Sequence, residues 1–442
     1  MVLFLHNRYR TTGGEERVVD SLLSLVRERL GEDAELLARE SAGLGRGRAA
    51  AGLLRGGLAP RDVGKAVRMT GARVVHAHNL NPRFGWRALA AARGEGARVV
   101  LHLHQYRLVC ATGVCFTEGR ECTRCHGRNT LPGVIHNCRG NRGEALAYGA
   151  ALALWQRRLV EQADAVIVPS LFARERLREL GAPLDFERVH VLAPPVTSVD
   201  DGGHSAGDSP PARDSDHTPD RAEDGHHAPG RPREGADGVA SERYALVVAR
   251  LSREKGVDVV IEACRIAGVP LVVAGDGPER DTLRARVCRD RDRDRESRPS
   301  SARASHAKME HPHTGPQAPG VRFVGHVDDA ELARLRGGAA LAIVPSLSAE
   351  TFGMAAAEAM AAGLPVAASR IGALPELVDE SGLAEPGDAH SLAEAIGRLW
   401  GDSEAGTRAR ERVRELCSPE VVANGLEAVY GTSPSAGRRA RQ

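Results

Sequence analysis

Two glutamates eight positions apart, Glu350 and Glu358, mark the part of the sequence best suited to bind a phosphorylated ligand. They lie in the run Glu350-Thr-Phe-Gly-Met-Ala-Ala-Ala-Glu358-Ala-Met-Ala-Ala-Gly363. An apolar strand is predicted at Leu341–Pro345, and a helix is predicted to begin near Gly353. The first turn of a helix has unpaired N–H groups and a partial positive charge, both of which favour an anion. Gly353 has no side chain, so a ligand can approach the backbone there. The sequence therefore predicts a phosphate site at this helix N-terminus.

The two glutamates have more than one interpretation. The helix predicted over Gly353–Ala362 is apolar and small on every side except at Glu358, which predicts that the helix is buried. A buried carboxylate is costly without a partner. The diol of a bound ribose and the side chain of a core arginine are equally compatible with the sequence. For Glu350 the alternatives to a ligand contact are an exposed loop carboxylate and a helix cap.

Arg250 and Lys255 form a second candidate phosphate site. Arg250 ends a predicted strand, and Lys255 precedes a predicted helix. Both would reach the same crevice, where arginine supplies a bidentate fork and lysine a mobile point charge. The chain has three lysines among its 60 basic residues, so a lysine at this place is informative. The neighbouring Arg253 and Glu254 are interpreted as surface charges.

Two glycine-containing turns are weaker signals. Val272-Val-Ala-Gly275-Asp-Gly277 ends a predicted strand before a helix, and such a turn permits close backbone approach; any tight strand–helix turn could have the same pattern. Gly13 and Gly14 follow the first predicted strand and open a helix. They form either an anion-binding turn or a plain turn.

A cysteine-rich loop is the clearest candidate for a metal site. Five of the eight cysteines lie in it: Cys110, Cys115, Cys122, Cys125 and Cys138. Cys122-Thr-Arg-Cys125 has the spacing of a zinc-binding pair. Cys110 and Cys138 could complete four thiolates, with His126 or His136 as substitutes. A structural zinc and reduced thiols are the two interpretations, and a metal would stabilise a long loop with few apolar residues.

The positions of these candidate site residues depend on the alternating strands and helices that the sequence predicts. In the first part of the chain, strands are predicted at Val2–His6, Ala34–Ala38, Arg73–Ala77, Arg98–His104, Ala165–Pro169 and Val189–Leu192, and helices at Glu15–Leu30, Pro60–Thr70, Arg83–Arg93, Arg142–Ala163 and Leu171–Leu180. In the second part, strands are predicted at Tyr244–Arg250, Leu271–Gly275, Val321–Gly325, Leu341–Pro345 and Pro365–Ser369, and helices at Gly256–Ala267, Pro278–Val287, Asp328–Arg336, Gly353–Ala362, Ser391–Trp400 and Glu404–Leu416.

The predicted fold is therefore α/β, with two doubly wound domains. An N-terminal domain at 1–197 is followed by a polar, disordered linker at 198–242. The C-terminal domain at 243–416 carries a disordered insert at 289–320, which opens with alternating Arg and Asp and is interpreted as a solvated tether. A C-terminal helix and tail occupy 417–442.

Composition excludes several classes of protein. The net charge is +2, which argues against a nucleic-acid-binding protein. The N-terminus does not resemble a signal peptide, and no apolar run is long enough to span a membrane, so we expect a cytoplasmic protein. The apolar helix around Ala145–Trp155 is followed by two arginines. We expect it in the core of the first domain, with peripheral contact to the inner face of a membrane as the alternative.

Taken together, the motifs resemble the retaining nucleotide-sugar glycosyltransferases of the GT-B fold, the group 1 (family 4) type marked by a Glu-x7-Glu signature. Glu350 and Glu358 have that spacing, and Phe323-Val-Gly-His-Val327 also occurs in the order that the family shows. The resemblance covers nearly the whole chain outside the two inserts. It implies a hexosyltransferase with two Rossmann-like domains facing across a cleft, the donor in the second and the acceptor in the first.

The resemblance also implies roles for individual residues. Those matching Arg250 and Lys255 hold the donor diphosphate and stabilise the leaving charge. The residue matching Glu350 contacts the donor sugar, and the one matching Glu358 binds the ribose. Further donor contacts, mainly through the backbone, are implied at Gly13, Gly14, Gly275, Gly277, Val327, Phe352, Gly353 and Met354. The family needs no metal for this chemistry.

One histidine gains a role only through this resemblance. His104, at the end of the strand predicted over Arg98–His104, matches the family's histidine near the anomeric carbon. Gln105 stands where the family often has Asp or Asn. His76 and His78 lie at another strand end and are interpreted as having no task.

The expected donor is a UDP- or GDP-sugar. The acceptor is not identified, and an envelope polysaccharide, a lipid-linked glycan and a small metabolite all fit. The alternatives are a non-catalytic nucleotide-sugar-binding scaffold on the same fold and another enzyme on a similar fold, a nucleotide-sugar epimerase or a phosphorylase. A phosphorylase would need a pyridoxal lysine, for which only Lys255 is suitably placed.

Overall fold

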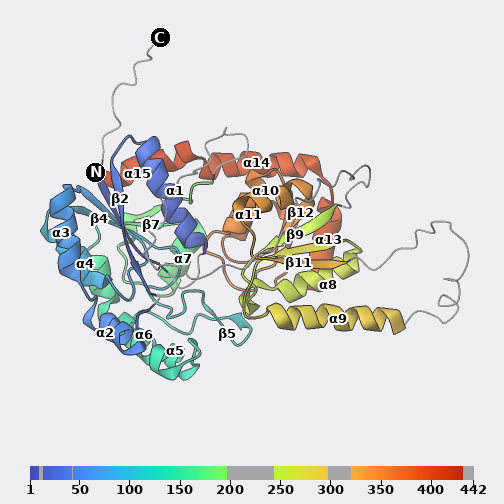
Figure 1. The fold of residues 1–442 in the computed structure, drawn as a ribbon, viewed down its shortest axis with the longest axis horizontal. Helices are drawn as coiled ribbons and strands as arrows, with labels where there is room; N and C mark the ends of the chain where they lie inside the picture. Colours follow the sequence, from blue (N-terminus) through green and yellow to red (C-terminus); the bar gives the residue numbers. More distant parts are fainter. Residues whose placement is uncertain (9–12, 42, 197–242, 297–319, 432–442) are drawn as a thin grey trace, which may run out of the picture.

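A computed structural model of the chain describes residues 1–8, 13–41, 43–196, 243–296 and 320–431. The predicted linker at 198–242, most of the predicted insert at 289–320 and the tail at 432–442 lie outside the described residues. Figure 1 shows two domains side by side, the first drawn from blue to green and the second from yellow to red.

The first domain is built on a parallel sheet with the strand order β2-β1-β3-β4-β7-β8. Its strands are β1 (Val2–Arg8), β2 (Ala34–Glu40), β3 (Val74–Ala77), β4 (Arg98–His102), β7 (Ala165–Val168) and β8 (Val189–Val191). Its helices are α1 (Gly14–Glu28), α2 (Arg46–Arg55), α3 (Pro60–Thr70), α4 (Gly85–Gly94), α5 (Leu131–Ile135), α6 (Arg142–Glu161) and α7 (Leu171–Glu179). Side chains alternate across the strands. Leu3, Val75 and their neighbours therefore pack against α3 and α4, while Val2, Phe4 and their neighbours pack against α1.

The second domain repeats this plan with the order β11-β10-β9-β12-β13-β14. Its strands are β9 (Tyr244–Val248), β10 (Leu271–Ala274), β11 (Val321–Gly325), β12 (Ala339–Val344), β13 (Val366–Ser369) and β14 (Leu383–Ala384). Its helices are α8 (Val257–Ala267), α9 (Arg280–Glu296), α10 (Asp329–Gly338), α11 (Met354–Ala361), α12 (Leu374–Leu377), α13 (Ala389–Leu399) and α14 (Ser403–Cys417). The predicted pair of doubly wound domains is confirmed.

Several local predictions need correction. The Arg/Asp run from residue 289 continues α9 to Glu296 and is not a disordered tether. The short helices α2, α5 and α12, the strand β14 and the hairpin of β5 (Phe116–Thr117) with β6 (Arg120–Glu121) were not predicted.

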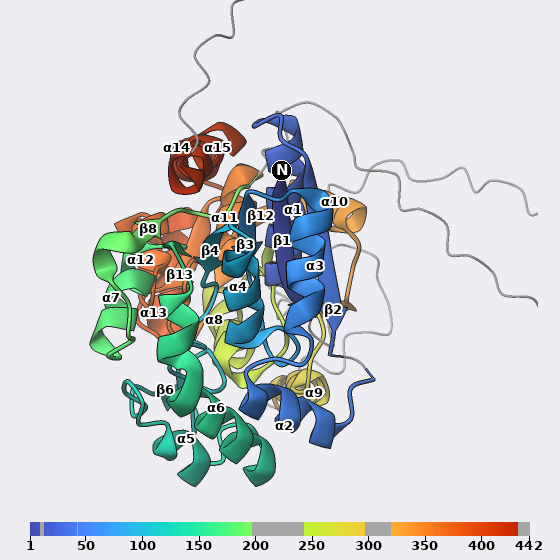
Figure 2. The same cartoon turned by 90° about the vertical axis from the view of Figure 1, so that its left-hand side faces the viewer.

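The last described helix, α15 (Pro419–Tyr430), returns to the first domain. Figures 1 and 2 show α14 and α15 running end to end across the two domains. Val422 and Leu426 are buried in the same cluster as Val2 and Phe4, so α15 covers the sheet face beside α1. The Tyr430 hydroxyl forms a 2.8 Å hydrogen bond with His76 Nδ1. A helix at the end of the chain therefore completes the core of the first domain.

Candidate functional site

The carboxyl edge of the second sheet brings the predicted ligand-binding residues together. β9 and β12 are neighbouring strands. Arg250 follows β9 and Glu350 follows β12, so both lie at the same edge. Val327, which follows β11, lies at this edge too and packs against the apolar cluster around Leu246. Parallel sheets of this kind bind ligands at this edge.

Lys255 and Glu350 form the central ion pair, with Lys255 Nζ 2.5 Å from Glu350 Oε1. The hydroxyl of the buried Ser346 donates to the same oxygen at 2.6 Å. Burial acts to raise the pKa of Glu350, but the Lys255 ammonium and its hydrogen bonds hold that pKa below the usual value. Burial acts to lower the pKa of Lys255, and Glu350 raises it above the usual value. Both groups are therefore charged at neutral pH.

A tight turn places Lys255 against the loop after β12. Residues Arg253–Lys255 form a 3-10 turn that ends at Gly256, where φ is 63°. A Cβ at Gly256 would lie 2.1 Å from the carbonyl oxygen of Pro345, so only glycine fits. Arg250 is exposed, and within the described chain its guanidinium makes no hydrogen bond or ion pair. Its charge acts to lower the pKa of Lys255, which places it near the ion pair.

The N-terminus of α11 opens at the same edge. Phe352 is buried, and Gly353 has φ 105°. A Cβ at Gly353 would lie 2.7 Å from Leu374 Cδ2, so packing against this side chain and the positive φ both favour glycine here. Met354 packs against buried residues of both domains. The N–H groups of the first turn have no partner within the helix, as the phosphate prediction requires.

Glu358 has the arginine partners that the sequence left as one of two alternatives. Its carboxylate lies 2.5 Å from Arg336 NH2 on α10 and 3.5 Å from Arg17 NH1 on α1 of the other domain. Together with Met354, these three residues line a pocket between the domains of about 1050 Å³. A ribose bound to Glu358 would share this carboxylate with the arginines.

The turn at Gly275 and Gly277 serves backbone packing. A Cβ at Gly275 would lie 1.9 Å from the carbonyl oxygen of Ala249, and one at Gly277 would lie 2.4 Å from that of Leu251. The Gly275 N–H donates to Gly325, and the Gly277 N–H donates to Asp276 Oδ1. The close backbone approach predicted for these glycines is present. The backbone that approaches them is that of Ala249 and Leu251, in the segment between β9 and Lys255.

In the first domain, Gly13 and Gly14 precede α1 as predicted. Gly13 N–H donates to Glu16 Oε2 at 2.9 Å, so the turn already contains an anionic group. A Cβ at Gly14 would lie 4.0 Å from Met354 Cγ, which confirms that this turn faces the second domain.

His104 lies directly at the contact between the domains. Its carbonyl oxygen accepts a 2.8 Å hydrogen bond from Thr351 Oγ1. Its ring Nε2 forms a 2.8 Å hydrogen bond with His78 Nδ1. Burial lowers the pKa of His104, and the nearby Glu15 acts to raise it. His104 is therefore neutral at pH 7. Across the domain interface it contacts Thr351, the residue that follows Glu350.

Sequence reasoning missed the residues that hold the two domains together. Ser170 Oγ donates to the Thr351 carbonyl oxygen at 2.7 Å. Glu376 accepts hydrogen bonds from the N–H groups of Leu171 and Phe172, at the N-terminus of α7. The Ser residue before a predicted helix was a usable signal for a cap, but no pattern in the sequence linked these partners.

His76 and His78 belong to a buried cluster with His102. Among the described residues, these three place ligand atoms within 4.8 Å of one another. His76 stacks on His102 with ring centroids 5.3 Å apart, nearly parallel. His76 Nε2 and His102 Nδ1 form a 3.2 Å hydrogen bond with each other. Burial lowers the pKa of His76 to about 3 and lowers that of His78 and His102 well below the usual value, so the cluster is neutral.

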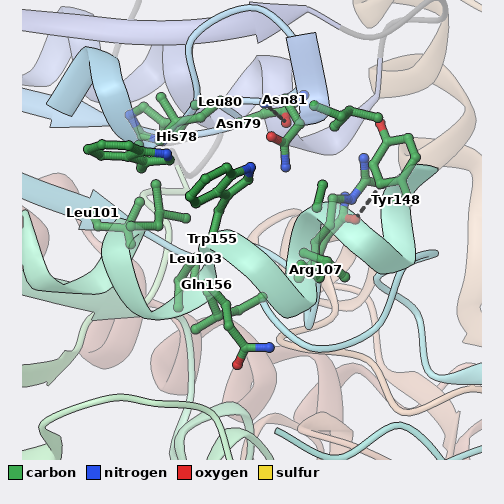
Figure 3. A pocket seen from close by; sticks show the side chains of 18 of the residues that line it. His78, Asn79, Leu80, Asn81, Leu101, Leu103, Arg107, Tyr148, Trp155 and Gln156 are labelled. Carbon is green, nitrogen blue, oxygen red and sulfur yellow. Dashed lines mark hydrogen bonds between the residues drawn. The ribbon is translucent and has the colours of Figure 1, made fainter. Parts of the chain in front are cut away.

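A pocket of about 800 Å³ opens beside these histidines, at the carboxyl ends of β3 and β4 (Figure 3). It reaches His78 and His104 at one end. Trp86, Tyr148 and Trp155, from α4 and α6, line its body.

The cysteine-rich loop surrounds a separate cavity of about 410 Å³. It is lined by Cys110, Cys115, Cys122, Cys125, Cys138 and His136. Within the described residues, no three of these thiols come within 4.8 Å of one another. A hydrogen bond from Cys115 lowers the pKa of Cys110 well below the usual value, whereas burial raises the pKa of Cys125 to about 11. His126 lies against Gly181 and does not line the cavity.

Both domains match families of known proteins. Residues 13–195 match the family described as "Glycosyl transferase 4-like domain", and residues 242–402 match "Glycosyl transferases group 1". Each match falls on one of the two sheets.

Curated relatives match over shorter segments. An MMP alpha-(1->4)-mannosyltransferase of Mycolicibacterium hassiacum is 41% identical over 112 residues, 24% of this chain and 27% of the relative. A glycogen synthase of Mycobacterium tuberculosis is 34% identical over 197 residues, 42% of this chain and 41% of the relative. The matched segments thus span less than half the length of these relatives.

The similarity to solved structures extends over the whole chain. The crystal structure of Anabaena HepE in complex with UDP and glucose has a TM-score of 0.55 and 16% identity, and the match covers 98% of this chain and 99% of that one. At this identity the likeness shows the fold. The predicted GT-B arrangement of two doubly wound domains is confirmed. No helix among the described residues is long and apolar enough to cross a membrane.

Proposed function

The two domains of this chain belong to the glycosyl transferase 4-like and group 1 glycosyl transferase families, and on this premise we propose that the chain transfers a hexosyl group from a nucleotide sugar to an acceptor hydroxyl with retention of anomeric configuration. The second domain binds the donor and the first binds the acceptor. The observation that carries the proposal is the Lys255–Glu350 pair, which lies beside Arg250 and the N-terminus of α11.

The main demand of this reaction is to stabilise negative charge on the departing nucleoside diphosphate. Preorganised cations and N–H dipoles in a partly dry site do this well. Arg250 and Lys255 supply the cations and the first turn of α11 supplies the dipoles, so we propose transfer without a catalytic metal.

Glu350 positions the donor sugar in this proposal and is not a nucleophile. Its carboxylate is held by Lys255 and Ser346, which leaves it stabilised and poorly reactive. Glu358 contacts the ribose, and His104 lies near the anomeric carbon. The solved relative with UDP and glucose supports a UDP-sugar as the first donor to try, with GDP-sugars as the alternative.

The cysteine-rich loop holds a structural zinc in this proposal, with Cys110, Cys122, Cys125 and Cys138 as ligands. The thiols line one cavity, which supports the proposal; because no three of them lie within 4.8 Å of one another in the described residues, the loop would have to contract around the ion. We place the protein in the cytoplasm, with the peripheral membrane contact of the first domain as the open alternative.

A nucleotide-sugar panel tests the proposed function. The melting temperature of the purified chain should rise with one UDP- or GDP-sugar, because a ligand that binds the native state stabilises it. Product formed with an accepted alcohol should keep the donor's anomeric configuration by NMR. Binding without turnover would favour a scaffold, and conversion of the donor sugar without an acceptor would favour an epimerase.

A further inference from the structure

The pocket beside His78 and His104 carries information about the acceptor. It lies in the first domain, at the edge of the sheet where ligands bind, and its inner end reaches the histidine joined to Thr351. The inference below rests on the proposed function, because it concerns the acceptor of that reaction.

The walls of this pocket are aromatic and aliphatic. The rings of Trp86 and Trp155 lie 5.8 Å apart and are inclined at 38°. Figure 3 shows Trp155 near the centre of the pocket, between the side lined by His78 and the side lined by Tyr148. Leu53, Leu80 and Leu152 are also among its lining residues. These surfaces favour an apolar body over a polar one.

Local structure fixes the two indoles. Trp155 Nε1 donates to the Leu54 carbonyl oxygen at 3.0 Å. The Trp86 ring lies over Gly56, where a Cβ would be 2.1 Å from its Nε1. Gly56 also has a positive φ of 71°. Both the backbone conformation of this turn after α2 and the close contact with Trp86 therefore require glycine.

The pocket has little charge to offer an anionic acceptor. Its charged lining residues are Glu15 and Arg107. Gln105 bridges them: its Nε2 donates to Glu15 at 3.2 Å, and its Oε1 accepts from Arg107 NH2 at 3.0 Å. One arginine that is already hydrogen-bonded, facing a carboxylate in the same network, does not make a phosphate or carboxylate site.

The outer surface next to the pocket is apolar and basic. Leu54 on α2 and Leu154 on α6 are 44% and 49% exposed, and each directly adjoins a pocket-lining residue in the chain. Exposed Arg55, Arg157 and Arg158 flank them. The Arg158 guanidinium lies 5.4 Å from the Trp155 ring centroid.

We propose that the acceptor is an amphiphile. Its hydroxyl-bearing polar end lies near His104, and its apolar body packs in the pocket against the indoles of Trp86 and Trp155. The same chemistry can come from a free alcohol in solution or from a lipid in a bilayer, whose headgroups would meet the exposed leucines and arginines.

Matched acceptors test this proposal once a donor has been found. Methyl β-D-glucoside and n-octyl β-D-glucoside carry the same hydroxyls and differ in the apolar tail. With the octyl compound kept below its micelle concentration, we expect its KM to be at least tenfold lower, because each buried methylene favours binding. We expect Trp155→Leu to remove most of that preference, and the UDP-induced rise in melting temperature reports in parallel whether this variant is folded.

A vesicle arm separates the two sources of amphiphile. Dodecyl β-D-glucoside is presented in vesicles of phosphatidylcholine with phosphatidylglycerol. If the acceptor is a membrane lipid, the double variant Leu54→Ser, Leu154→Ser should lose at least fivefold activity on vesicles. Met69→Ser, an exposed apolar position on α3, should leave it unchanged. Unchanged activity on vesicles would instead assign the source to a soluble alcohol, and activity on free octyl glucoside reports whether the double variant leaves the pocket intact.

Two results would overturn the inference, and they are distinguishable. Equal use of methyl and octyl glucoside would reject an amphiphilic acceptor while leaving the transfer reaction intact. Absence of binding and turnover with every nucleotide sugar would reject the proposed function, and the inference with it.

Discussion

Thr351 and His104 are 247 residues apart in the chain, and the hydroxyl of Thr351 donates a 2.8 Å hydrogen bond to the carbonyl of His104. Thr351 follows Glu350, which pairs with Lys255, and His104 reaches the apolar pocket. This hydrogen bond therefore links the proposed donor site directly to the proposed acceptor site.

Loss of this bond should loosen the active arrangement of the two domains. We expect Thr351→Val to lower kcat/KM by roughly 3- to 10-fold, since a hydrogen bond contributes about 1 kcal/mol. Thr351→Ser keeps the hydroxyl and should retain most activity. Small-angle scattering with saturating UDP should show a larger radius of gyration for the valine variant, and identical curves with identical rates would contradict the prediction.

Lys255 should be the more damaging position in the donor site. Lys255→Ala removes the cation proposed to meet the diphosphate and leaves the half-buried Glu350 without its partner. We expect kcat to fall by roughly 10²- to 10³-fold and the pKa of Glu350 to rise. The matched control is Arg253→Ala, an exposed cation two residues away that pairs loosely with Glu279. Similar rates for the two variants would show that Lys255 does not contact the donor.

Gly275 should matter for stability. An alanine would place its Cβ 1.9 Å from the Ala249 carbonyl oxygen, at a φ of 136°. We expect Gly275→Ala to lower the free energy of unfolding by more than about 2 kcal/mol. Gly397→Ala, in α13 where the added methyl meets nothing within 4 Å, should be neutral or stabilising. Chemical denaturation of both variants measures the difference.

The buried histidines should make the fold sensitive to acid. Burial lowers the pKa of His76 to about 3, below its unfolded value near 6.5. The unfolded chain therefore binds the proton first, and stability is full above pH 6.5 and falls as the pH drops toward 3. Each such histidine contributes a slope of up to about 1.4 kcal/mol per pH unit.

Replacing one member of this cluster tests that slope. His76→Phe, beside Phe4, should reduce the loss of stability between pH 6.5 and pH 5, measured by urea unfolding at each pH. His390→Gln changes an exposed histidine and should leave the slope as it is. An unchanged slope for His76→Phe would place the acid sensitivity elsewhere.

The cysteine-rich loop should bind one zinc per chain. Metal analysis of the purified protein should find it, and a chelator should lower the melting temperature. The double variant Cys122→Ser, Cys125→Ser should lose the metal, whereas Cys288→Ser, at an exposed site on α9, should keep it. Protein purified without any bound metal, with five titratable thiols in the loop, would establish the reduced-thiol alternative.

Much of the fold follows from local signals in the sequence. Pro60 at the first position of α3 and Gly71 after its last residue mark that helix at both ends, and its predicted bounds are confirmed. The helix α2 escaped prediction because Gly47 and Gly52 weaken its helical pattern. Glycine is required at position 52 because a Cβ there would lie 2.5 Å from the carbonyl oxygen of Pro82. That contact is with a residue 30 positions further along the chain.

The site was predictable as a set of positions but not as a set of contacts. The strand ends placed Arg250, Lys255 and Glu350 at one edge. The partner of Glu358 could not be derived, because Arg336 and Arg17 come from another helix and another domain. The histidine cluster had an available signal: His76-Ala-His78 and His102-Leu-His104 lie on neighbouring strands, where Ala77 pairs with Leu101.

The position of α15 has a consequence for how the protein is made. Residues 1–196 are synthesised long before the ribosome reaches Pro419. At roughly 5–20 residues per second, the time between these two events is tens of seconds or less. During that time the sheet face around Phe4 lacks the cover that Val422 and Leu426 later supply. The domain that is synthesised first is therefore the one that finishes folding last, and a nascent chain stalled before α15 exposes an apolar surface that chaperones can bind.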